Sequence, residues 1–585
     1  MRRRFARAAS VVFAAALAAL LLLPGLGAAP FDDPGEGQHA EIAREMAATG
    51  DWLVPRLNGV RYFDKPPLLY WMGAASFSTV GLHEGAARLW PFLGTVLAAA
   101  ATAALGARLM GPSGGVLAVG ALLSSALFVA YGRYVRPETL FVAAIQWALA
   151  ALLSGLDEPE PRRARLLTLI GCGALGLAAL AKDPIGLLAP LIAVALTLSV
   201  HGRLRPVSRW LSVPGVIALL LVGVAWYAIV ALRERGFLWY TIVDNHLLNA
   251  VRLRQFPDED VPLGALEFLA VSALGALPWI IPAAFGVASI VRGRLWRNPA
   301  EMSWTALALW SVGVFGLFAL VPFKLPHYAL PAYPAIALLA ARTWQAGARG
   351  LIVVHLMLFA LIAGLLGLAA ASDGRAFLGA VLSATDVYTR KEAAVGLAAP
   401  FPPWSALAPV VTTCALVFAA GSAALLAVLI ARAHRLAPWV VLATMVAAMP
   451  AVTTTMSAVA KSRAVRGLAL EIRRELGPDD LLVHEGPIEN AGALEFYSGR
   501  RPILLEATRS VLGFGATFAD TREVFWDAER FHREWCTGRR ILLVTARAPE
   551  QSIAARLPAQ SLRLRAIQNG RWLYDSGLRG PRGDC

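Results

Sequence analysis

Charged residues are scarce in this sequence. Only 16% of its 585 residues are Asp, Glu, Lys or Arg, while 57% are hydrophobic and the mean hydropathy is +0.58. A soluble domain carries about a quarter charged residues, so this shortage excludes an ordinary soluble protein and indicates a polytopic membrane protein. The net charge of +15 does not indicate nucleic-acid binding, because the arginines lie in short groups between apolar segments.

Cysteine is scarce as well. The four cysteines, Cys172, Cys414, Cys536 and Cys585, are scattered, and two of them lie in apolar segments. None forms a CxxC pair. We therefore expect neither a disulfide framework nor a cysteine metal site.

Apolar segments of membrane-spanning length recur along most of the chain. A spanning helix needs about 20 apolar residues, and some of these segments are short enough to be tilted or re-entrant. The predicted fold is an α-helical polytopic membrane protein with about 13 transmembrane helices. The segments lie at 11–29, 89–109, 115–131, 139–155, 166–181, 185–200, 211–231, 266–290, 303–321, 328–341, 350–371, 404–431 and 438–457.

The positions of the arginines support this count. Alternate loops, beginning with the N-terminus, are short and basic, which is typical of the cytoplasmic side. The other loops hold nearly all the motif-like residues, so the chemistry is predicted to face the exterior or the periplasm. These outer loops are 30–88, 132–138, 182–184, 232–265, 322–327 and 372–403.

The first apolar run has two interpretations. "MRRRFARAAS" with the run ending in "GLGAAP" resembles a secretory signal peptide, but about 18 apolar residues also suffice for a span, and we favour a retained anchor. Either way the next residues, "FDDPGEGQHAEIAREM", lie outside. They bring three acids, Asp32, Asp33 and Glu36, to the membrane, followed by a helical stripe that could lie along its surface.

The composition changes after about residue 458. "KSRAVRGLALEIRRELGPDD" predicts an amphipathic helix that ends at Gly-Pro, and "LLVHE", "RPILLE" and "RRILLVTA" predict short buried strands. We predict a transmembrane part over 1–457, with a catalytic first outer loop over 30–88, and an extracytoplasmic α/β domain over 458–585. Its Glu485, Glu489 and Tyr497 are expected to cap and cover the sheet rather than to catalyse.

Several long motifs carry a family resemblance. "AEIAREMAATGDWLVPRLNGVRYFDKPPLLYW", then "EGAARLWP", "LAALAKDPIGLLAP" and "FKLPHYALPAYPAIALLAA" resemble segments of bacterial aminoarabinose transferases and protein O-mannosyltransferase relatives. These are GT-C glycosyltransferases that use polyprenyl-phosphate sugars. The resemblance in motifs covers roughly residues 30 to 345. For the rest of the chain it lies in the architecture, that is, the number of helices and the C-terminal domain outside the membrane.

The resemblance implies an enzyme of the bacterial cytoplasmic membrane. It would move a sugar, with inversion and without a nucleotide cofactor, from a polyprenyl-phosphate donor to a lipid A, glycan or protein hydroxyl acceptor at the outer face. A carboxylate would accept or orient the acceptor proton. Cations would hold the departing phosphate, and the lipid tail would lie in a groove between helices.

The sequence departs from this family at its catalytic position. Where the family has Asp-Glu followed by a small residue, Arg and Tyr, this chain has "GEGQH", so the aspartate position is Gly35. Glu36 and Asp33 flank the gap and are the predicted replacements, with Glu36 favoured. The alternative is that these acids stabilise the start of the following helix, and for Asp32 we prefer that alternative.

A second family carboxylate, usually Asp, corresponds to Glu138 in "YGRYVRPETL". We predict a catalytic role for Glu138; the alternative is an acid in the first turn of a helix that Pro137 begins. Arg133 and Arg136 flank it. These two arginines could pair with carboxylates or bind the lipid phosphate. The alternative is that they are ordinary arginines at the membrane interface.

Three lysines are candidates for binding the donor phosphate. Lys65 matches the family lysine at this place, and a flexible cation at the interface suits a phosphate, although an ion pair with Asp64 is the alternative. Lys182 and Lys324 are isolated lysines at the outer ends of apolar runs. The predicted substrate-binding set is completed by Tyr62 and, more weakly, by Arg252 and Arg254.

A metal site is the last candidate. Among nine histidines, His246 and His327 lie on outer loops, and with Asp64 they offer a set of ligands that suits zinc. The resemblance implies a structural metal with ligands at matching places. The alternative is that both histidines are hydrogen-bonded at the interface.

Two other classes of function compete with the enzyme. A transporter for a lipid-linked sugar predicts charged or broken helices at the membrane midplane, and most apolar segments here lack acids. A relative that binds a lipid-linked sugar without transferring it is the second alternative, because of Gly35.

Overall fold

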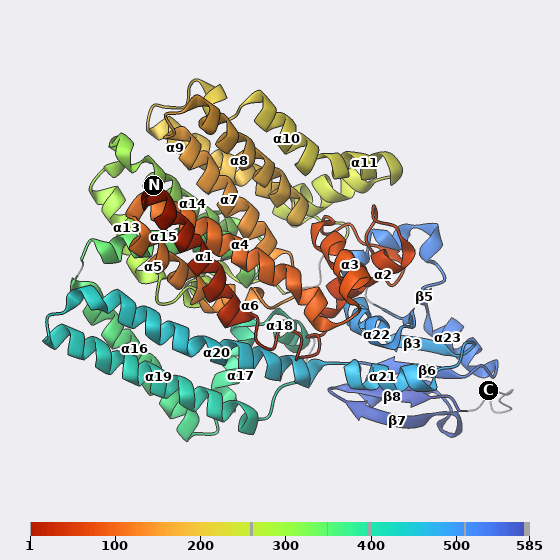
Figure 1. Ribbon diagram of the computed structural model, residues 1–585. Coiled ribbons are helices and arrows are strands. Elements are labelled where there is room, and N and C mark those ends of the chain that lie inside the picture. Colours follow the sequence, from red (N-terminus) through yellow and green to blue (C-terminus); the bar gives the residue numbers. More distant parts are fainter. Residues whose placement is uncertain (1, 258–260, 348, 395–399, 508–509, 578–585) are drawn as a thin grey trace.

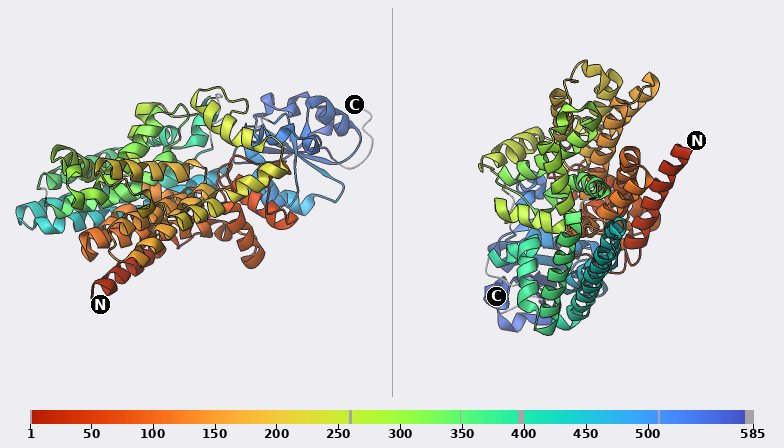
Figure 2. Two further views of the ribbon diagram at one scale, coloured as in Figure 1. Left: turned by 90° about the horizontal axis from the view of Figure 1, so that it is seen from above. Right: turned by 90° about the vertical axis from the view of Figure 1, so that its left-hand side faces the viewer.

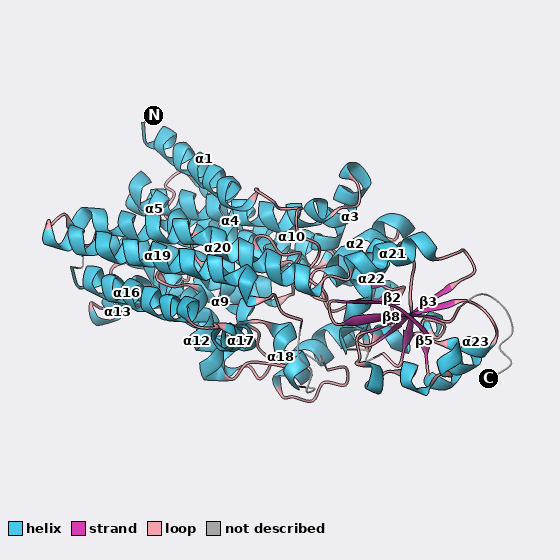
Figure 3. Cartoon of the chain, turned by 90° about the horizontal axis from the view of Figure 1, so that it is seen from below, coloured by secondary structure: helices cyan, strands magenta, loops and turns pink. Residues whose placement is uncertain are grey.

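A long helical bundle is joined at one end to a region that contains a β-sheet (Figure 1). The computed structural model describes residues 2–257, 261–347, 349–394, 400–507 and 510–577. The bundle runs from α1 (Arg2–Leu22) to α20 (Ala437–Arg463). Seen from two further sides, the helices of the bundle run roughly along its length, and the C-terminal part lies at its end (Figures 2 and 3).

Seven helices of the described residues are long and apolar enough to cross a membrane, or up to nine if each of two bent pairs forms one span. The bent pairs are α10 (Val213–Gly223) with α11 (Ala225–Arg233), and α12 (Ala265–Gly275) with α13 (Ile280–Arg292). The helical membrane fold is thus confirmed, while the count of thirteen stays a prediction. The seven are α4 (Glu84–Met110), α7 (Glu138–Leu156), α8 (Pro161–Ala181), α14 (Met302–Leu320), α16 (Arg349–Ala371), α19 (Trp404–Ile430) and α20.

The first outer loop forms structure of its own. It contains α2 (Gly37–Thr49), a short hairpin of β1 (Arg56–Leu57) and β2 (Val60–Arg61), and α3 (Leu68–Val80). Gly50 ends α2 in the left-handed conformation, with φ of 70°, which glycine adopts without steric cost.

Helix α2 does not lie along the membrane surface as we expected. Most of its residues are buried, because it packs against α3 and against α22 (Ala491–Ser498) of the C-terminal region. The backbones come close: a Cβ on Gly37 would lie 2.5 Å from the Cβ of Ala493. The apolar stripe was read correctly, but its partner is protein rather than lipid.

The C-terminal region contains a mixed six-stranded sheet in the order β5-β4-β3-β6-β8-β7. The first four strands are parallel, and β8 and β7 are antiparallel. The strands expected from "LLVHE", "RPILLE" and "RRILLVTA" are β3, β4 and β6. The bounds are β3 (Leu481–Glu485), β4 (Ile503–Leu505), β5 (Phe525–Trp526), β6 (Ile541–Thr545), β7 (Arg563–Gln568) and β8 (Arg571–Asp575), with α21 (Arg466–Glu475) and α23 (Ala528–Cys536) beside α22.

One cysteine departs from expectation. Cys172 and Cys414 are free, but Cys536 at the end of α23 is disulfide-bonded. A bond between distant cysteines leaves no local spacing pattern in the sequence, so the scattered cysteines gave no sign of this one.

Candidate active site

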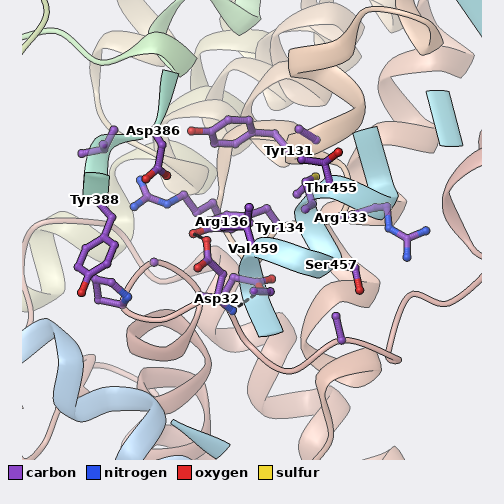
Figure 4. A pocket seen from close by; sticks show the side chains of 18 of the residues that line it. Asp32, Tyr131, Arg133, Tyr134, Arg136, Asp386, Tyr388, Thr455, Ser457 and Val459 are labelled. Carbon is purple, nitrogen blue, oxygen red and sulfur yellow. Dashed lines mark hydrogen bonds between the residues drawn. The ribbon is translucent and has the colours of Figure 1, made fainter. Parts of the chain in front are cut away.

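A cavity of about 1130 Å³ lies where the first outer loop, the helical bundle and the C-terminal region meet. Its wall combines segments that are far apart in sequence. The lining residues come from 32–39 (but not Asp33 or Gly37) and 62–65 of the first loop, from 130–136 before α7, from Lys182, from 325–328 and 385–391, and from 453–462 of α20. Figure 4 shows how several of these side chains converge.

The predicted phosphate ligands on this wall include Lys65, Arg136 and Lys182. They lie close enough together that all three hold down the pKa of the buried His327, although burial is the larger cause. The pKa of Lys182 is lowered by its burial, against the opposing effect of Glu138, and further by Lys65 and Arg136. Such a cluster of cations in a cavity favours an anionic ligand.

Glu138 supports this cluster from behind. It starts α7, is only 2% exposed and is not part of the cavity wall. Its Oε1 lies 3.5 Å from Nζ of Lys182 and 3.3 Å from Nε2 of His327. Nδ1 of His327 is in turn 2.8 Å from the hydroxyl of Tyr131. The predicted catalytic role of Glu138 stays a prediction, and in the structure Glu138 holds two residues of the wall.

Lys65 and Tyr62 lie where the resemblance implied. Lys65 is on the wall and forms an ion pair with Asp64, the alternative that the sequence left open. Burial would raise the pKa of Asp64, but Lys65 and Arg254 hold it below its usual value. Tyr62 is buried on the wall, with its ring 6.0 Å from that of Tyr70.

Two predicted cations do not serve the cavity. Lys324 is buried off the wall, and its Nζ donates to the carbonyl of Ala319, 3.1 Å away, at the C-terminal end of α14. Arg133 is on the wall, but its Nη1 donates to the carbonyls of Leu22 (2.6 Å) and Pro24 (2.7 Å) at the end of α1. Figure 4 shows its guanidinium turned away from Asp32. Both cations stabilise helix C-termini, where carbonyls lack partners.

The weaker pair of arginine candidates also lies elsewhere. Nε of Arg254 is 3.3 Å from Oδ2 of Asp244, and neither Arg252 nor Arg254 belongs to the described cavity wall.

The two favoured carboxylates are both held by arginine. Glu36 lies on the wall but is 1% exposed and accepts four hydrogen bonds, two from Arg88 at 2.8 and 2.6 Å and one each from the backbone N–H of Asp32 and Val135, both at 3.0 Å. Asp33 is fully buried, lies off the wall and is paired with Arg571 of β8. Neither arrangement suits a group that must take up a proton during catalysis.

The carboxylate that the sequence assigned to a helix cap, Asp32, lies on the cavity wall instead. The Tyr134 hydroxyl donates to its Oδ2 at 2.9 Å, and Oδ1 accepts no hydrogen bond. Burial raises the pKa of Asp32 to about 6, although Arg463 opposes the shift. The sequence could not distinguish Asp32 from Asp33, because the direction in which each side chain points depends on the backbone conformation of the loop.

The predicted zinc ligands do not come together. Nδ1 of His246 lies 2.6 Å from the carbonyl of Thr241 in the π-helical segment Trp239–Leu248. His327 and Asp64 have the separate partners described above, so the alternative of hydrogen-bonded histidines fits both histidines. The three residues do not fit a shared metal ion, and we derive no step through one.

One acidic cluster among the described residues does have the spacing of metal ligands: Glu41, Glu45 and Glu495. Its carboxylates are already paired. Arg44 donates to Glu41 and, at 3.0 Å, to Glu495, and Arg501 donates to Glu45 at 2.7 Å. This cluster joins α2 to α22.

Comparison with known proteins agrees with this architecture. Residues 64–227 match the family described as dolichyl-phosphate-mannose-protein mannosyltransferase. The undecaprenyl phosphate-α-4-amino-4-deoxy-L-arabinose arabinosyl transferase of Edwardsiella ictaluri is 30% identical over 316 residues, 53% of this chain and 54% of that protein. Its counterpart in Pseudomonas aeruginosa strain LESB58 is 30% identical over 318 residues, 52% and 54% of the two chains. This chain thus spans about half the length of the curated relatives it matches.

The solved structures extend the likeness to the whole fold. The crystal structure of ArnT from Cupriavidus metallidurans bound to undecaprenyl phosphate has a TM-score of 0.80 at 23% identity, covering 98% of this chain and 99% of that one. The structure of the same protein in the apo state has a TM-score of 0.79. The resemblance to the ArnT-like and protein O-mannosyltransferase group of GT-C glycosyltransferases is therefore confirmed, in sequence over about half of the chain and in fold over nearly all of it.

Proposed function

We propose that this protein is a membrane glycosyltransferase that takes a sugar from a polyprenyl-phosphate donor and passes it to an acceptor hydroxyl. The observation that carries the proposal is the joint position of Lys65, Arg136 and Lys182 on one cavity wall that also presents a carboxylate. Three cations suit a phosphate that gains charge as it leaves. The cations lie at one end of the helical bundle rather than near its middle, which favours a transferase over a transporter.

The chemistry is a single displacement. The acceptor oxygen bonds to the anomeric carbon as the bond from that carbon to the phosphate oxygen breaks. The phosphate keeps the electron pair, and the acceptor proton passes to a carboxylate of the protein. Lys65, Arg136 and Lys182 would stabilise the released lipid phosphate, so no nucleotide is needed.

The donor class follows from the relatives. Their names specify undecaprenyl phosphate-α-4-amino-4-deoxy-L-arabinose as the donor, and we propose an undecaprenyl-phosphate pentose or hexose for this chain. The proposed acceptors are lipid A, a glycan or a protein hydroxyl.

The proposed topology places the site outside the cytoplasm. We propose a bacterial inner-membrane protein with about 13 spans, whose first loop, cavity and residues 458–585 face the periplasm. The short basic loops at alternate ends of the helices support this orientation.

The test uses purified full-length protein and radiolabelled undecaprenyl-phosphate sugars, including the 4-amino-4-deoxy-L-arabinose form, with lipid A as the first acceptor. Transfer of label to an acceptor is the expected result. Lys182→Gln should raise KM for the donor about 10-fold or more, since a charge-assisted contact is worth roughly 1.5–3 kcal/mol. Lys324→Gln is the matched control, because that lysine lies off the wall, and should leave KM unchanged.

Binding of undecaprenyl phosphate without transfer to lipid A, glycan or protein extracts would contradict the enzyme and favour a binding protein. Equal KM values for wild type and Lys182→Gln would contradict the phosphate site.

A further inference from the structure

The place of a side chain at position 35 is taken by Tyr134. A Cβ built on Gly35 would lie 2.0 Å from the hydroxyl oxygen of Tyr134 and 3.0 Å from its Cζ. Both distances are shorter than ordinary van der Waals contacts, so the tyrosine fills the room that a larger residue 35 would need. The absence of a side chain at Gly35 and the presence of a tyrosine at 134 are therefore one structural feature.

The tyrosine brings its hydroxyl to a neighbouring carboxylate. Tyr134 donates to Oδ2 of Asp32 at 2.9 Å, and its ring lies 6.0 Å from that of Tyr131 on the same wall. Figure 4 shows Asp32 and Tyr134 next to each other on the cavity. The pair thus places a carboxylate beside the space next to Gly35 that the Tyr134 side chain fills.

Asp32 differs from the other carboxylates of the described wall in its partners. Asp386 is held by Nη2 of Arg463 at 2.8 Å and by Thr389, through its N–H at 2.7 Å and its hydroxyl at 2.6 Å. Glu489 accepts from Nζ of Lys391 at 2.8 Å, and Glu36 and Asp64 are held as described above.

In contrast, Oδ1 of Asp32 is buried without a hydrogen-bond partner, and Nη1 of Arg463 is 3.7 Å from it. The side chain of Asp32 as a whole keeps 14% exposure, against 2% for that of Glu36, although Oδ1 itself is not exposed. Asp32 therefore retains an oxygen that can take a proton without breaking an existing hydrogen bond.

We propose that Asp32 is the catalytic carboxylate that receives the acceptor's hydroxyl proton, and that Tyr134 is the positioning residue that holds it. This inference rests on the proposed glycosyl transfer. The acceptor O–H bond breaks toward Asp32, the acceptor oxygen bonds to the anomeric carbon, and the lipid phosphate leaves with the electron pair of the broken C–O bond.

The surroundings of Asp32 suit this task. Arg463 from α20 and the Tyr134 hydroxyl favour its charged form, whereas burial, Asp386 and Glu36 favour its neutral form. Asp33 is its other charged neighbour, and it is paired with Arg571. A base works best when its pKa lies near the working pH, because it is then both ionised and basic.

The first experiment compares two adjacent aspartates. Asp32→Asn should lower kcat at least 100-fold, the usual contribution of a general base, while binding of radiolabelled undecaprenyl phosphate and the thermal midpoint stay unchanged. Asp33→Asn is the matched control: it should keep kcat within a few-fold and lower the thermal midpoint. Retention of more than about a tenth of wild-type kcat by Asp32→Asn would overturn the inference.

The second experiment separates positioning from mere support of the fold. With Asp32 acting as a base, kcat/KM of the wild type should fall below about pH 6. Tyr134→Phe removes a hydrogen bond that favours the carboxylate, so this inflection should move to higher pH. A loss of activity that is equal at every pH, with the inflection unmoved, would contradict the role of Tyr134.

The failure of this inference can be told apart from failure of the proposed function. If wild type binds undecaprenyl phosphate yet transfers no sugar, the transferase proposal fails and the role of Asp32 fails with it. If wild type transfers sugar and Asp32→Asn does so equally well, only the role of Asp32 is wrong.

Discussion

At the scale of the residue, the decisive feature is how completely each polar group of the first loop is already bonded. Asp32, Asp33 and Glu36 lie within five positions of one another, yet they meet three different partners. Asp33 meets Arg571, Glu36 meets Arg88, and Asp32 meets Tyr134. Their chemical type is shared, so their roles follow from their neighbours alone.

The fit of Tyr134 over Gly35 can be tested by stability. Gly35→Ala should lower the free energy of unfolding by about 1–3 kcal/mol, because overpacking a filled site forces its neighbours to move. Thermal unfolding in detergent measures the effect. The double variant Gly35→Ala with Tyr134→Phe should recover part of the loss, since the closest contact is with the tyrosine oxygen. Equal losses in the single and double variants would show that the two positions do not compete for space.

At the scale of the element, the cation cluster depends on where helices begin and end. Glu138 is in the first turn of α7, and Lys182 follows the last residue of α8. These two helices pack against each other along their length. The ion pair between Glu138 and Lys182 therefore holds the proposed phosphate ligand Lys182 in place, and its position depends on how these two membrane helices are aligned.

Removing the charge of Glu138 tests this arrangement. Glu138→Gln keeps the shape of the side chain but leaves Lys182 and His327 without their anionic partner. We expect KM for the polyprenyl-phosphate donor to rise several-fold while kcat changes less, because a positioning residue acts through the ligand that it holds. Steady-state kinetics over donor concentration measures both values. A loss of kcat alone would indicate instead that Glu138 takes part in proton transfer.

At the scale of the whole molecule, the cavity exists because the C-terminal region is fastened to the first loop. Asp33 pairs with Arg571, α2 packs on α22, and the hydroxyl of Tyr497 donates to Glu84 at 2.9 Å while accepting from the N–H of Phe31 at 3.0 Å. These contacts join residues more than 400 positions apart. The expectation that Tyr497 is structural agrees with them.

The pair of Asp33 and Arg571 should behave as a buried salt bridge. Arg571→Gln leaves a buried aspartate without its cation and should cost about 3–5 kcal/mol in the free energy of unfolding. The double variant with Asp33→Asn should be more stable than Arg571→Gln alone, because no charge is then left unpaired. Thermal unfolding of all four proteins forms the cycle, and strictly additive losses would contradict a direct coupling.

Much of the fold, and the side of the membrane on which the charged residues lie, can be predicted from the sequence for a physical reason. The cost of placing charges in a bilayer confines them to the loops, so Lys65, Arg136 and Lys182 could be assigned to one side of the membrane from hydropathy. Helix and strand positions also follow from local periodicity, as in α2, β3 and β6. Lys324 was misassigned because hydropathy cannot say whether a lysine at the end of a helix faces a cavity or the carbonyls of its own helix.

The sequence by itself determined that this is a polytopic membrane protein that resembles GT-C glycosyltransferases, with its cations and acids gathered at one end of the helices, because hydropathy and motifs are local properties of the chain. Only the tertiary structure decided which carboxylate of the cavity wall keeps an oxygen without a hydrogen-bond partner. That choice depends on Tyr134, Arg463 and Arg571, which lie about 100 to 540 positions away, and no local pattern encodes such long-range contacts. Tertiary packing also keeps Asp64, His246 and His327 from forming one metal site, because Asp64 pairs with Lys65, His246 bonds to the carbonyl of Thr241, and His327 bonds to Tyr131.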